Sequence, residues 1–427
     1  MSHSLIRSDE KIKDDVSFDP SEYERGMPLR GGFRFKKSEF DNNQHSDFAL
    51  FAKKADDVSL DGFDPNYLEN QSGGGFPRAN EKIKLKTTVF ETCAGGVTSL
   101  SLFLINNILL TSTMRNIYVD GLGLYLYFAI NYLAAANNSE IELKNFFTFP
   151  KKEQTAPCIE RFNTELDNCS DMLKQYTIVL YNCDIPIDSE YANQYKKNMM
   201  FVEVGVDPSE CRRLNRILKT NFGLSSDSII PRGMAKKGIS VLNLSKISPI
   251  WDFTIDNVMM KTFQNRKELF MIIRNKEFGY HDDGQYKLLE LPTMEKKIIM
   301  GVMIGNVARI DEERLRQNIS KLRPTPFRQI ELPIIKTKKK LRVTNLMRTC
   351  GLKAYFLKTE IPDIFPEGGD VTDMIQYTEI DIGMNSSKSK TFDSKQKTDR
   401  RIVVDTPFYY YFRLADSKSI ISFGSYY

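Results

Sequence analysis

The stretch Asp405-Thr406-Pro407-Phe408-Tyr409-Tyr410-Tyr411-Phe412-Arg413 decides how this chain folds, together with Ile420-Ile421-Ser422-Phe423-Gly424, which follows it. Aromatic residues occupy both alternating sets of positions in the first segment, which is typical of a strand buried on both faces. The polar run Asp416-Ser417-Lys418-Ser419 between the two segments has the composition of a turn. The sequence therefore predicts a buried β-hairpin over residues 408–423.

Upstream of this hairpin, the chain changes from helical to strand-like patterns. Apolar residues recur at helical spacing from Val89 to Ala136, which predicts buried helices. Later apolar runs are short and read as strands, at 239–244, 287–291, 298–304, 328–335, 408–414 and 420–423. Helices followed by strands, without βαβ alternation, predict an α+β fold.

Residues 1–88 differ from the rest of the chain. They contain Pro20, Pro28, Pro65, Pro77 and the run Gly73-Gly74-Gly75, and they lack sustained apolar periodicity. A segment of this composition cannot bury enough surface to fold alone. We therefore predict an extended N-terminal arm over residues 1–88 and a folded domain over 89–427.

The composition argues against several function classes. The 427 residues include 60 Lys+Arg and 55 Asp+Glu, a net charge of +5, which implies no domain-wide basic field and makes nucleic acid an unfavoured partner. Only three histidines are present, and the chain lacks a phosphate loop, a Gly-x-Ser-x-Gly motif and a His-Glu-x-x-His motif. We expect no enzymatic activity and no cofactor.

The location of the protein is predicted from its first residues and its most apolar stretch. Residues 1–20 are polar and mixed in charge, unlike a secretory signal, so an intracellular location is expected. The apolar stretch 97–136 is interrupted by Asn106, Asn107, Arg115 and Asp120, which favours buried helices over a membrane span.

The cysteines show no metal-binding spacing, so no metal site is expected. Free thiols are the favoured state in a reducing compartment. Cys158, Cys169 and Cys183 lie in the polar region 150–190 and are expected to be exposed, and we predict that at least one of them forms an intermolecular disulfide in a mature assembly. Cys93 and Cys350 lie beside apolar helical segments and are predicted to be buried.

The region 89–427 also resembles the serpin superfamily, because a series of landmarks stands in the family's order. These are Asn243 and Trp251, then 278–283, Leu288-Leu289-Glu290-Leu291-Pro292, 298–304 with Gly305 where a proline is usual, Glu331-Leu332-Pro333, and Pro407-Phe408 through Gly424. The resemblance implies a helical N-terminal part followed by mostly antiparallel β-sheets. It also implies an exposed reactive-like loop at residues 384–404.

Inhibitory serpins work by insertion of this loop. A protease cleaves the loop, and its first half enters a sheet as a new strand, which requires a hinge of small residues. Here Ser386 stands where the family has glycine, and no alanine occurs in the loop. The reactive-loop-like residues are Ser386, Ser387, Lys388, Ser389, Lys390, Arg400 and Arg401.

Both possible insertion registers would bury charge. One register would bury Asp393 and Lys395, and the other would bury Lys388 and Lys390. An unpaired buried charge costs several kcal/mol. We therefore predict that the loop does not work as a trap.

Other positions that the resemblance assigns to control of sheet opening have also changed. Thr92-Cys93 stands for the family's Ser-Pro, Gly95 for a serine and Gln376 for a histidine, while Asn243 remains. These departures put the moving part of the fold in doubt.

Three functions follow as hypotheses. The first is a non-inhibitory structural protein that self-assembles through the arm; its most concrete form is a polyhedrin-like matrix of a viral occlusion body, although no motif specifies a virus. The alternative is an intracellular serine protease inhibitor with Arg400 as trypsin-like bait in the 384–404 loop. The basic charge of this loop has a simpler interpretation, a solvated loop kept extended by charge repulsion. The third is binding of a polyanion or nucleic acid by residues 336–342 and the charged loop. For residues 336–342 the simpler interpretation is a charged strand edge that prevents wrong strand pairing.

Overall fold

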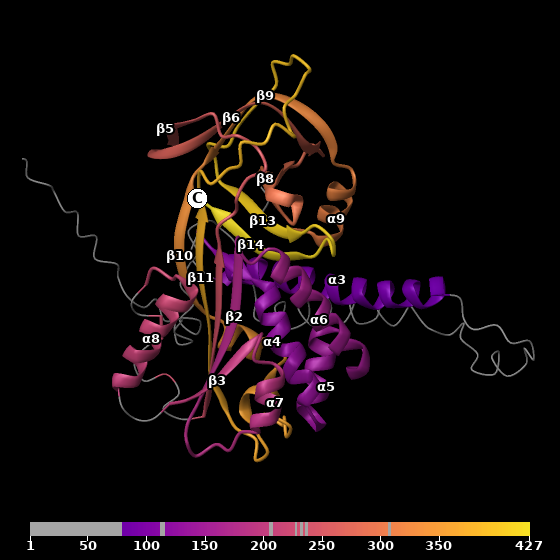
Figure 1. Ribbon diagram of the computed structural model, residues 1–427, viewed down its shortest axis with the longest axis vertical. Coiled ribbons are helices and arrows are strands. Elements are labelled where there is room, and N and C mark those ends of the chain that lie inside the picture. Colours follow the sequence, from indigo (N-terminus) through magenta and orange to yellow (C-terminus); the bar gives the residue numbers. More distant parts are fainter. Residues whose placement is uncertain are drawn as a thin grey trace, which may run out of the picture. The chain divides into compact units, whose positions relative to one another are not determined.

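The structure is a computed structural model (Figure 1), and it describes residues 79–427 except 112–115, 205–207, 227–228, 231–233, 235–237 and 306–308. Its α-helices are α3 (Ala79–Thr111), α4 (Gly121–Ala134), α5 (Asn137–Phe147), α6 (Lys152–Asn168), α7 (Ser189–Gln194), α8 (Pro208–Phe222), α9 (Glu312–Ser320), α10 (Thr344–Thr349) and α11 (Lys353–Leu357). Its strands are β1 (Tyr118–Asp120), β2 (Leu173–Tyr181), β3 (Met199–Glu203), β4 (Ile239–Ile247), β5 (Asn257–Phe263), β6 (Arg266–Asp282), β7 (Lys287–Pro292), β8 (Ile298–Ile304), β9 (Arg323–Pro333), β10 (Ile335–Arg342), β11 (Val371–Ile382), β12 (Arg401–Val403), β13 (Phe408–Leu414) and β14 (Ile420–Tyr426).

The α+β prediction is confirmed, with two shifted helix boundaries. Helix α3 begins at Ala79, inside the predicted arm, because residues 79–88 are rich in helix formers. Residues 118–120, expected to be helical, pair with β14 instead, so the next helix begins at Gly121. The remainder of the predicted arm, residues 1–78, lies outside the described residues.

Helix α3 contains a segment, Val89–Leu110, that is long and apolar enough to cross a membrane by length and composition. Its most apolar window is 61% buried within the fold, and Val97, Leu104 and Ile105 are fully enclosed. The packing therefore accounts for the apolar character of this helix as part of the core.

One sheet has five strands in the order β10-β11-β4-β2-β3, and it is covered on both faces. Residues such as Val241 on one face join the main core with α4 and its neighbouring helices. Leu242 and Leu244 on the other face pack against Leu214 and Leu218 of α8. Figure 1 shows α8 and the α4–α6 helices on either side of these strands.

The second sheet has nine strands, eight of them in the order β1-β14-β13-β8-β7-β6-β9-β12, with β5 paired to β6. The predicted C-terminal hairpin is present, and its first strand, β13, pairs with both β14 and β8. Phe408, Tyr410 and Tyr411 are each at most 1% exposed. The aromatic residues on both faces are therefore enclosed, as their pattern predicts.

Two glycines make room for the rings of β13. A Cβ on Gly424 would lie 2.2 Å from the ring of Tyr410, its partner in the strand register. A Cβ on Gly301 would lie 2.0 Å from the ring of Tyr411, the residue it faces on β8. Glycine is therefore required at both positions for close packing of the tyrosines.

Candidate functional site: the 384–404 loop and the central strand pair

The centre of the five-stranded sheet is the parallel pair of β4 and β11, the place where a loop strand would insert. The register runs from Ile239 opposite Val371 to Ile247 opposite Ile380, so the two strands are directly hydrogen-bonded neighbours. Residues 383–400 leave the end of β11 and lead to β12. No strand of the described chain therefore lies between β4 and β11, and the loop lies outside the sheet.

Buried polar side chains fasten the central strands on the core side. Gln376 on β11 faces Asn243 on β4, and its Nε2 donates to Asn243 Oδ1 at 3.0 Å. Gln376 also binds the backbone of Asp120, donating to its carbonyl (2.7 Å) and accepting from its N–H (2.8 Å). Asn243 in turn donates to Thr177 Oγ1 of β2 at 3.2 Å. Gln376, which departs from the family pattern, therefore bonds β11 to β4 and β1, and Asn243 extends this network to β2.

The Asp120 carboxylate lies beneath this network and caps α4. Its Oδ1 accepts from the N–H of Gly123 (3.1 Å) and from Nε2 of Gln175 (2.5 Å). Because Asp120 is fully buried, desolvation raises the pKa of its carboxyl to about 7, and the hydrogen bonds oppose this rise only in part. The support beneath the central strands therefore contains a group that titrates near neutral pH.

The first half of the loop is held by Trp251, one of the predicted landmarks. The indole Nε1 of Trp251 donates to the carbonyl of Gly383 at 2.9 Å. The Trp251 backbone accepts from the N–H of Ser387 and donates to the carbonyl of Asn385, both at 2.8 Å. Ser386 forms a parallel bridge with Trp251 between these bonds. The hinge therefore runs beside the chain that follows β4.

A second anchor lies at Phe392, in the middle of the loop. Its ring stacks on Phe278 of β6, with centroids 5.6 Å apart, and its carbonyl accepts from the N–H of Glu277 at 2.9 Å. The next residue, Asp393, forms an ion pair with Lys276, which is 6% exposed. The sequence singled out neither residue as an anchor, although a lone aromatic in a charged loop was an available signal.

The third anchor is β12, which pairs in parallel with β9 from Arg401 opposite Gln329. The carbonyl of Arg400 accepts from the N–H of Arg328 at 2.9 Å. The guanidinium of Arg400 lies over the rings of Tyr280 and Phe327, 5.7 and 5.9 Å from their centroids. The Arg400–Arg401 peptide bond is thus at the start of a paired strand.

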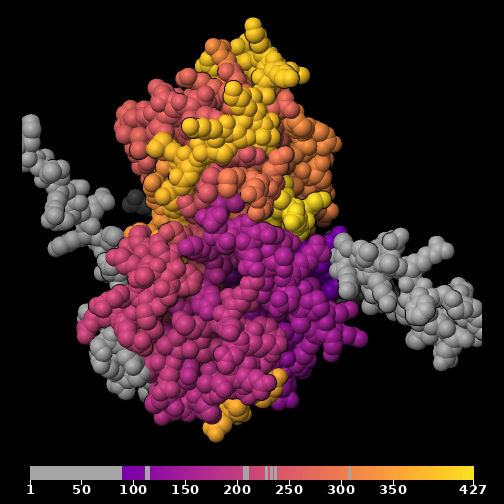
Figure 2. Space-filling model, in the orientation of Figure 1, coloured from indigo at the N-terminus to yellow at the C-terminus, as the bar shows by residue number. Residues whose placement is uncertain are grey.

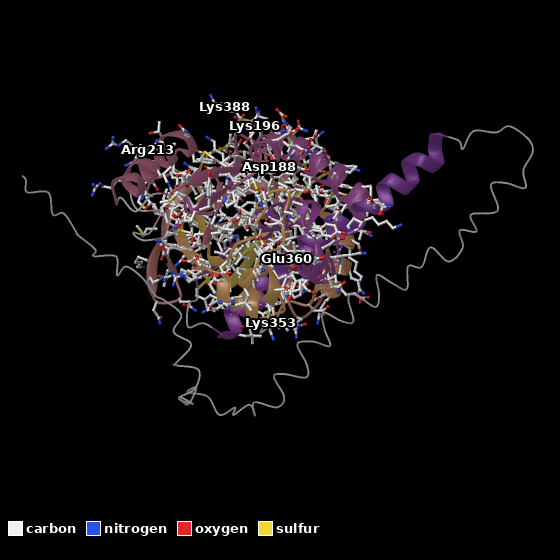
Figure 3. The ribbon with its side chains drawn as sticks, turned by 90° about the horizontal axis from the view of Figure 1, so that it is seen from below. Asp188, Lys196, Arg213, Lys353, Glu360 and Lys388 are labelled. Carbon is white, nitrogen blue, oxygen red and sulfur yellow. The ribbon has the colours of Figure 1, made fainter. Side chains whose placement is uncertain are left out.

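Between these anchors the loop presents its basic side chains to solvent. Lys388, Lys390, Lys395 and Lys397 are all exposed. Figure 2 shows the loop atoms, in yellow, at the upper end of the view, and Lys388 lies at the rim of the molecule in Figure 3. The residues that would have to be buried on insertion are therefore in water.

The remaining landmark residues lie in the packed body. Asn243, Trp251, Pro292, Pro333, Phe408 and Gly424 are buried, and Pro407 is half-buried. These positions hold strand ends, sheet centres and ring contacts, which are packing roles.

Two cysteine expectations are wrong, and a third holds only in part. Cys158 is buried, with its Sγ 2.7 Å from Sγ of Cys93, and Cys169 is buried at the end of α6. Most polar residues of 150–170 lie on the outer face of helix α6, whereas Cys158 lies on its inner face and Cys169 caps its C-terminal end, so the average polarity of the region gave the wrong expectation for both thiols. Cys183 is exposed as expected, Cys93 is buried as expected, and Cys350 is half-buried. In the part of the chain that the structure describes, no cluster of His, Cys, Asp and Glu could hold a metal ion.

Comparison with known proteins places this architecture. Residues 96–427 match the model of one family, described as serpin (serine protease inhibitor), and the chain therefore belongs to the serpin family. No curated protein matches the sequence.

Solved serpin structures share the fold at low sequence identity. The mouse protein Z-dependent protease inhibitor superposes with a TM-score of 0.69 and 14% identity over 79% of this chain and 98% of its own. A structure described as a tumour-suppressing serpin gives 0.70 and 14%, over 79% and 99%. Native protease nexin-1 with heparin gives 0.68 and 14%, over 80% and 99%. At this identity the likeness establishes the fold alone.

Proposed function

We propose that this chain is a non-inhibitory serpin, with no catalytic activity of its own, whose loop is anchored to the body. The observation that carries the proposal is that the loop's charged side chains are exposed and would be buried by insertion in either register. One register would bury Lys388 and Lys390, and the other would bury Asp393 and Lys395. Each unpaired buried charge costs several kcal/mol. Two such charges offset much of the gain from adding a strand.

The anchors add to this cost. Insertion would break the Lys276–Asp393 pair and leave the buried Lys276 ammonium without its carboxylate. It would also remove Phe392 from Phe278. The loop is anchored outside the sheet, and its insertion would be costly. Both properties support the proposal that the body of this serpin is used for its shape or its surface.

Limited digestion with trypsin tests this proposal. We expect fragments cut within 388–401, identified by mass spectrometry, and no protease–serpin complex that survives SDS. A matched variant that replaces Lys388, Lys390, Asp393 and Lys395 by alanine removes the charges from both registers and tests whether they are the barrier. An SDS-stable complex of the unmodified chain would overturn the proposal.

The alternative is inhibition of a trypsin-like protease, and the basic composition of the exposed loop favours it. Arg400 is the bait residue predicted from the sequence, but its carbonyl is engaged by Arg328. Lys395 and Lys397 lie between the second and third anchors and are freely accessible. If the chain is an inhibitor, we expect cleavage after one of these lysines, because a protease binds its substrate as an unpaired extended strand.

Self-assembly through residues 1–88 remains a further proposal, with an occlusion-body matrix as its most concrete form. It rests on the composition of that segment, since arm exchange is a low-cost route to oligomers. A variant lacking residues 1–80 should stay monomeric in light scattering if the arm drives assembly. An intermolecular disulfide, if one forms, should involve Cys183, the exposed thiol among the three predicted, and Cys183→Ser should abolish the ladder on a non-reducing gel.

A further inference from the structure

A cavity of about 480 Å³ lies where the β5–β6 hairpin, the start of β10 and the C-terminal strands meet. In Figure 1 the C-terminus is marked near β10, one of the strands that line this cavity. Its lining includes the basic residues Arg266, Lys267, Lys336 and Lys339, and the acidic residue Glu268. The cavity is therefore rich in positive charge.

Lys339 reaches the cavity from an unusual position. On β10, the edge strand of the five-stranded sheet, Lys339 alternates with Ile335 and Leu341, which are both buried in the core. Its neighbour Lys338 points to the opposite face and is exposed. Lys339 thus occupies a core-facing register position, is half-buried and lines the cavity.

The ammonium of Lys339 has no carboxylate partner among the described residues, whereas other cations of the cavity have one. Arg266 pairs with Glu268 at 3.1 Å, and Lys336 pairs with Asp381 at 3.3 Å. Burial lowers the pKa of Lys339, and no neighbouring anion opposes this effect. The second cation without a carboxylate, Lys267, donates to Thr262 Oγ1 at 3.1 Å.

Part of the cavity lining is apolar. Met260 and Leu269 are 60% and 46% exposed, and Ile334 and Tyr426 complete this side. Exposed apolar side chains beside uncompensated cations match a ligand that has a hydrophobic body and an anionic group.

We propose that this cavity binds a small organic anion with a hydrophobic body, whose anionic group contacts Lys339. The site is separate from the loop, so it stands whether or not the chain inhibits a protease. An inward-pointing lysine on an edge strand can also serve only to prevent strand pairing between molecules. Lys338 and Arg342 already place charge along the outer face of this strand, however, and a core-facing ammonium adds a desolvation cost that a bound anion would offset.

The test uses the full chain and the fluorescent anion 8-anilinonaphthalene-1-sulfonate, with the uncharged N-phenyl-1-naphthylamine as the matched ligand. We expect saturable binding of the sulfonate that weakens as salt is raised, and weaker binding of the neutral analogue. Lys339→Met keeps the length of the side chain and removes the charge, and it should raise the Kd of the sulfonate about tenfold, as expected for one charge-assisted contact.

Two variants control this measurement. Lys338→Met, one residue away on the opposite face, should leave the Kd unchanged, and Lys339→Arg should keep most of the affinity. An equal Kd for Lys339→Met and the unmodified chain, or equal binding of the charged and neutral probes, would overturn the proposal. Tighter binding of the sulfonate by Lys339→Met, together with aggregation of this variant, would also overturn the proposal. That result is expected if Lys339 only protects the strand edge. If Lys339→Met does not fold, Lys267→Met should show the same direction of change, and an unaltered Kd there would count as failure.

Discussion

The C-terminal strands and the loop that precedes them are neighbours in sequence but are constrained in opposite ways. In β13 and β14 the tyrosine rings lie against glycine backbones, so each side chain is fixed by its neighbours. In the loop, charged side chains extend into water between three anchors. The comparison teaches that close packing fixes the side chains of the body, whereas the loop is held only at its anchors and carries charges that oppose the insertion we propose it has lost.

The largest expected difference between the two regions concerns ion pairs. Arg413 of β13 binds Glu290 through two hydrogen bonds of 2.7 Å, and Tyr411 donates to the same carboxylate at 2.8 Å. Glu290→Ala leaves a buried guanidinium unpaired and should lower the free energy of unfolding by about 3 to 5 kcal/mol. Asp399→Ala removes the exposed loop pair with Arg328 and should cost less than about 1 kcal/mol. Urea titrations of both variants measure this contrast, and equal losses would contradict it.

The glycines give the next largest effect. Gly424→Ala places a methyl group against the Tyr410 ring and should cost about 2 to 3 kcal/mol through overpacking. The control is Gly95→Ala in α3, where the nearest atom would be 3.5 Å away. That change should stabilise the protein by about 0.5 to 1 kcal/mol, because alanine favours a helix. Thermal unfolding that ranks the two variants in the reverse order would disprove the packing argument.

The pH dependence of stability tests the support beneath the central strands. The pKa of Asp120 is raised from 3.8 to about 7, so the folded protein holds a proton that the unfolded chain has released. The contribution of this proton to the free energy of unfolding is fully present below about pH 4 and is lost as the pH rises through 7. The free energy of unfolding should fall by up to about 1.4 kcal/mol per pH unit in this range. Asp120→Asn should flatten the stability profile between pH 4 and 7. A profile that is unchanged by the substitution would show that Asp120 is ionised throughout.

Within the loop itself, the effects should be small and uneven. Phe392→Ala removes the half-buried ring from Phe278 and should cost about 1 kcal/mol. Lys388→Ala should change the free energy of unfolding by less than about 0.5 kcal/mol, because its side chain is exposed. If both variants cost the same, Phe392 is not an anchor.

The sequence predicted β4, β7, β8, β9, β13 and β14, whose apolar runs pack into the core, but it did not predict β5, β6, β10, β11 or β12. Few folds bury an aromatic run like that of β13 on both faces and also place the landmark residues up to Gly424 in this order. The loop anchors were missed because the paired residues Lys276 and Asp393 are 117 positions apart, and only the fold brings the loop beside β6. Cys158 was misplaced because the average polarity of a helix says nothing about which face a residue occupies. Lys339 was likewise not singled out, because it lies in a run of basic residues. Only the register of β10 shows which of these residues face the core.

The central claim, that the loop does not insert, is tested most directly by the melting temperature before and after cleavage of the loop. The chain is cut briefly with trypsin within 388–401, the cut is located by mass spectrometry, and both forms are melted under the same conditions. Because insertion would bury charge in either register, we expect the cleaved and intact forms to melt within about 1.5 °C of each other, which for a folded body of this size is a difference of about 1 kcal/mol. A large rise in melting temperature on cleavage would mean that the loop has become a strand of the sheet, and it would contradict this account.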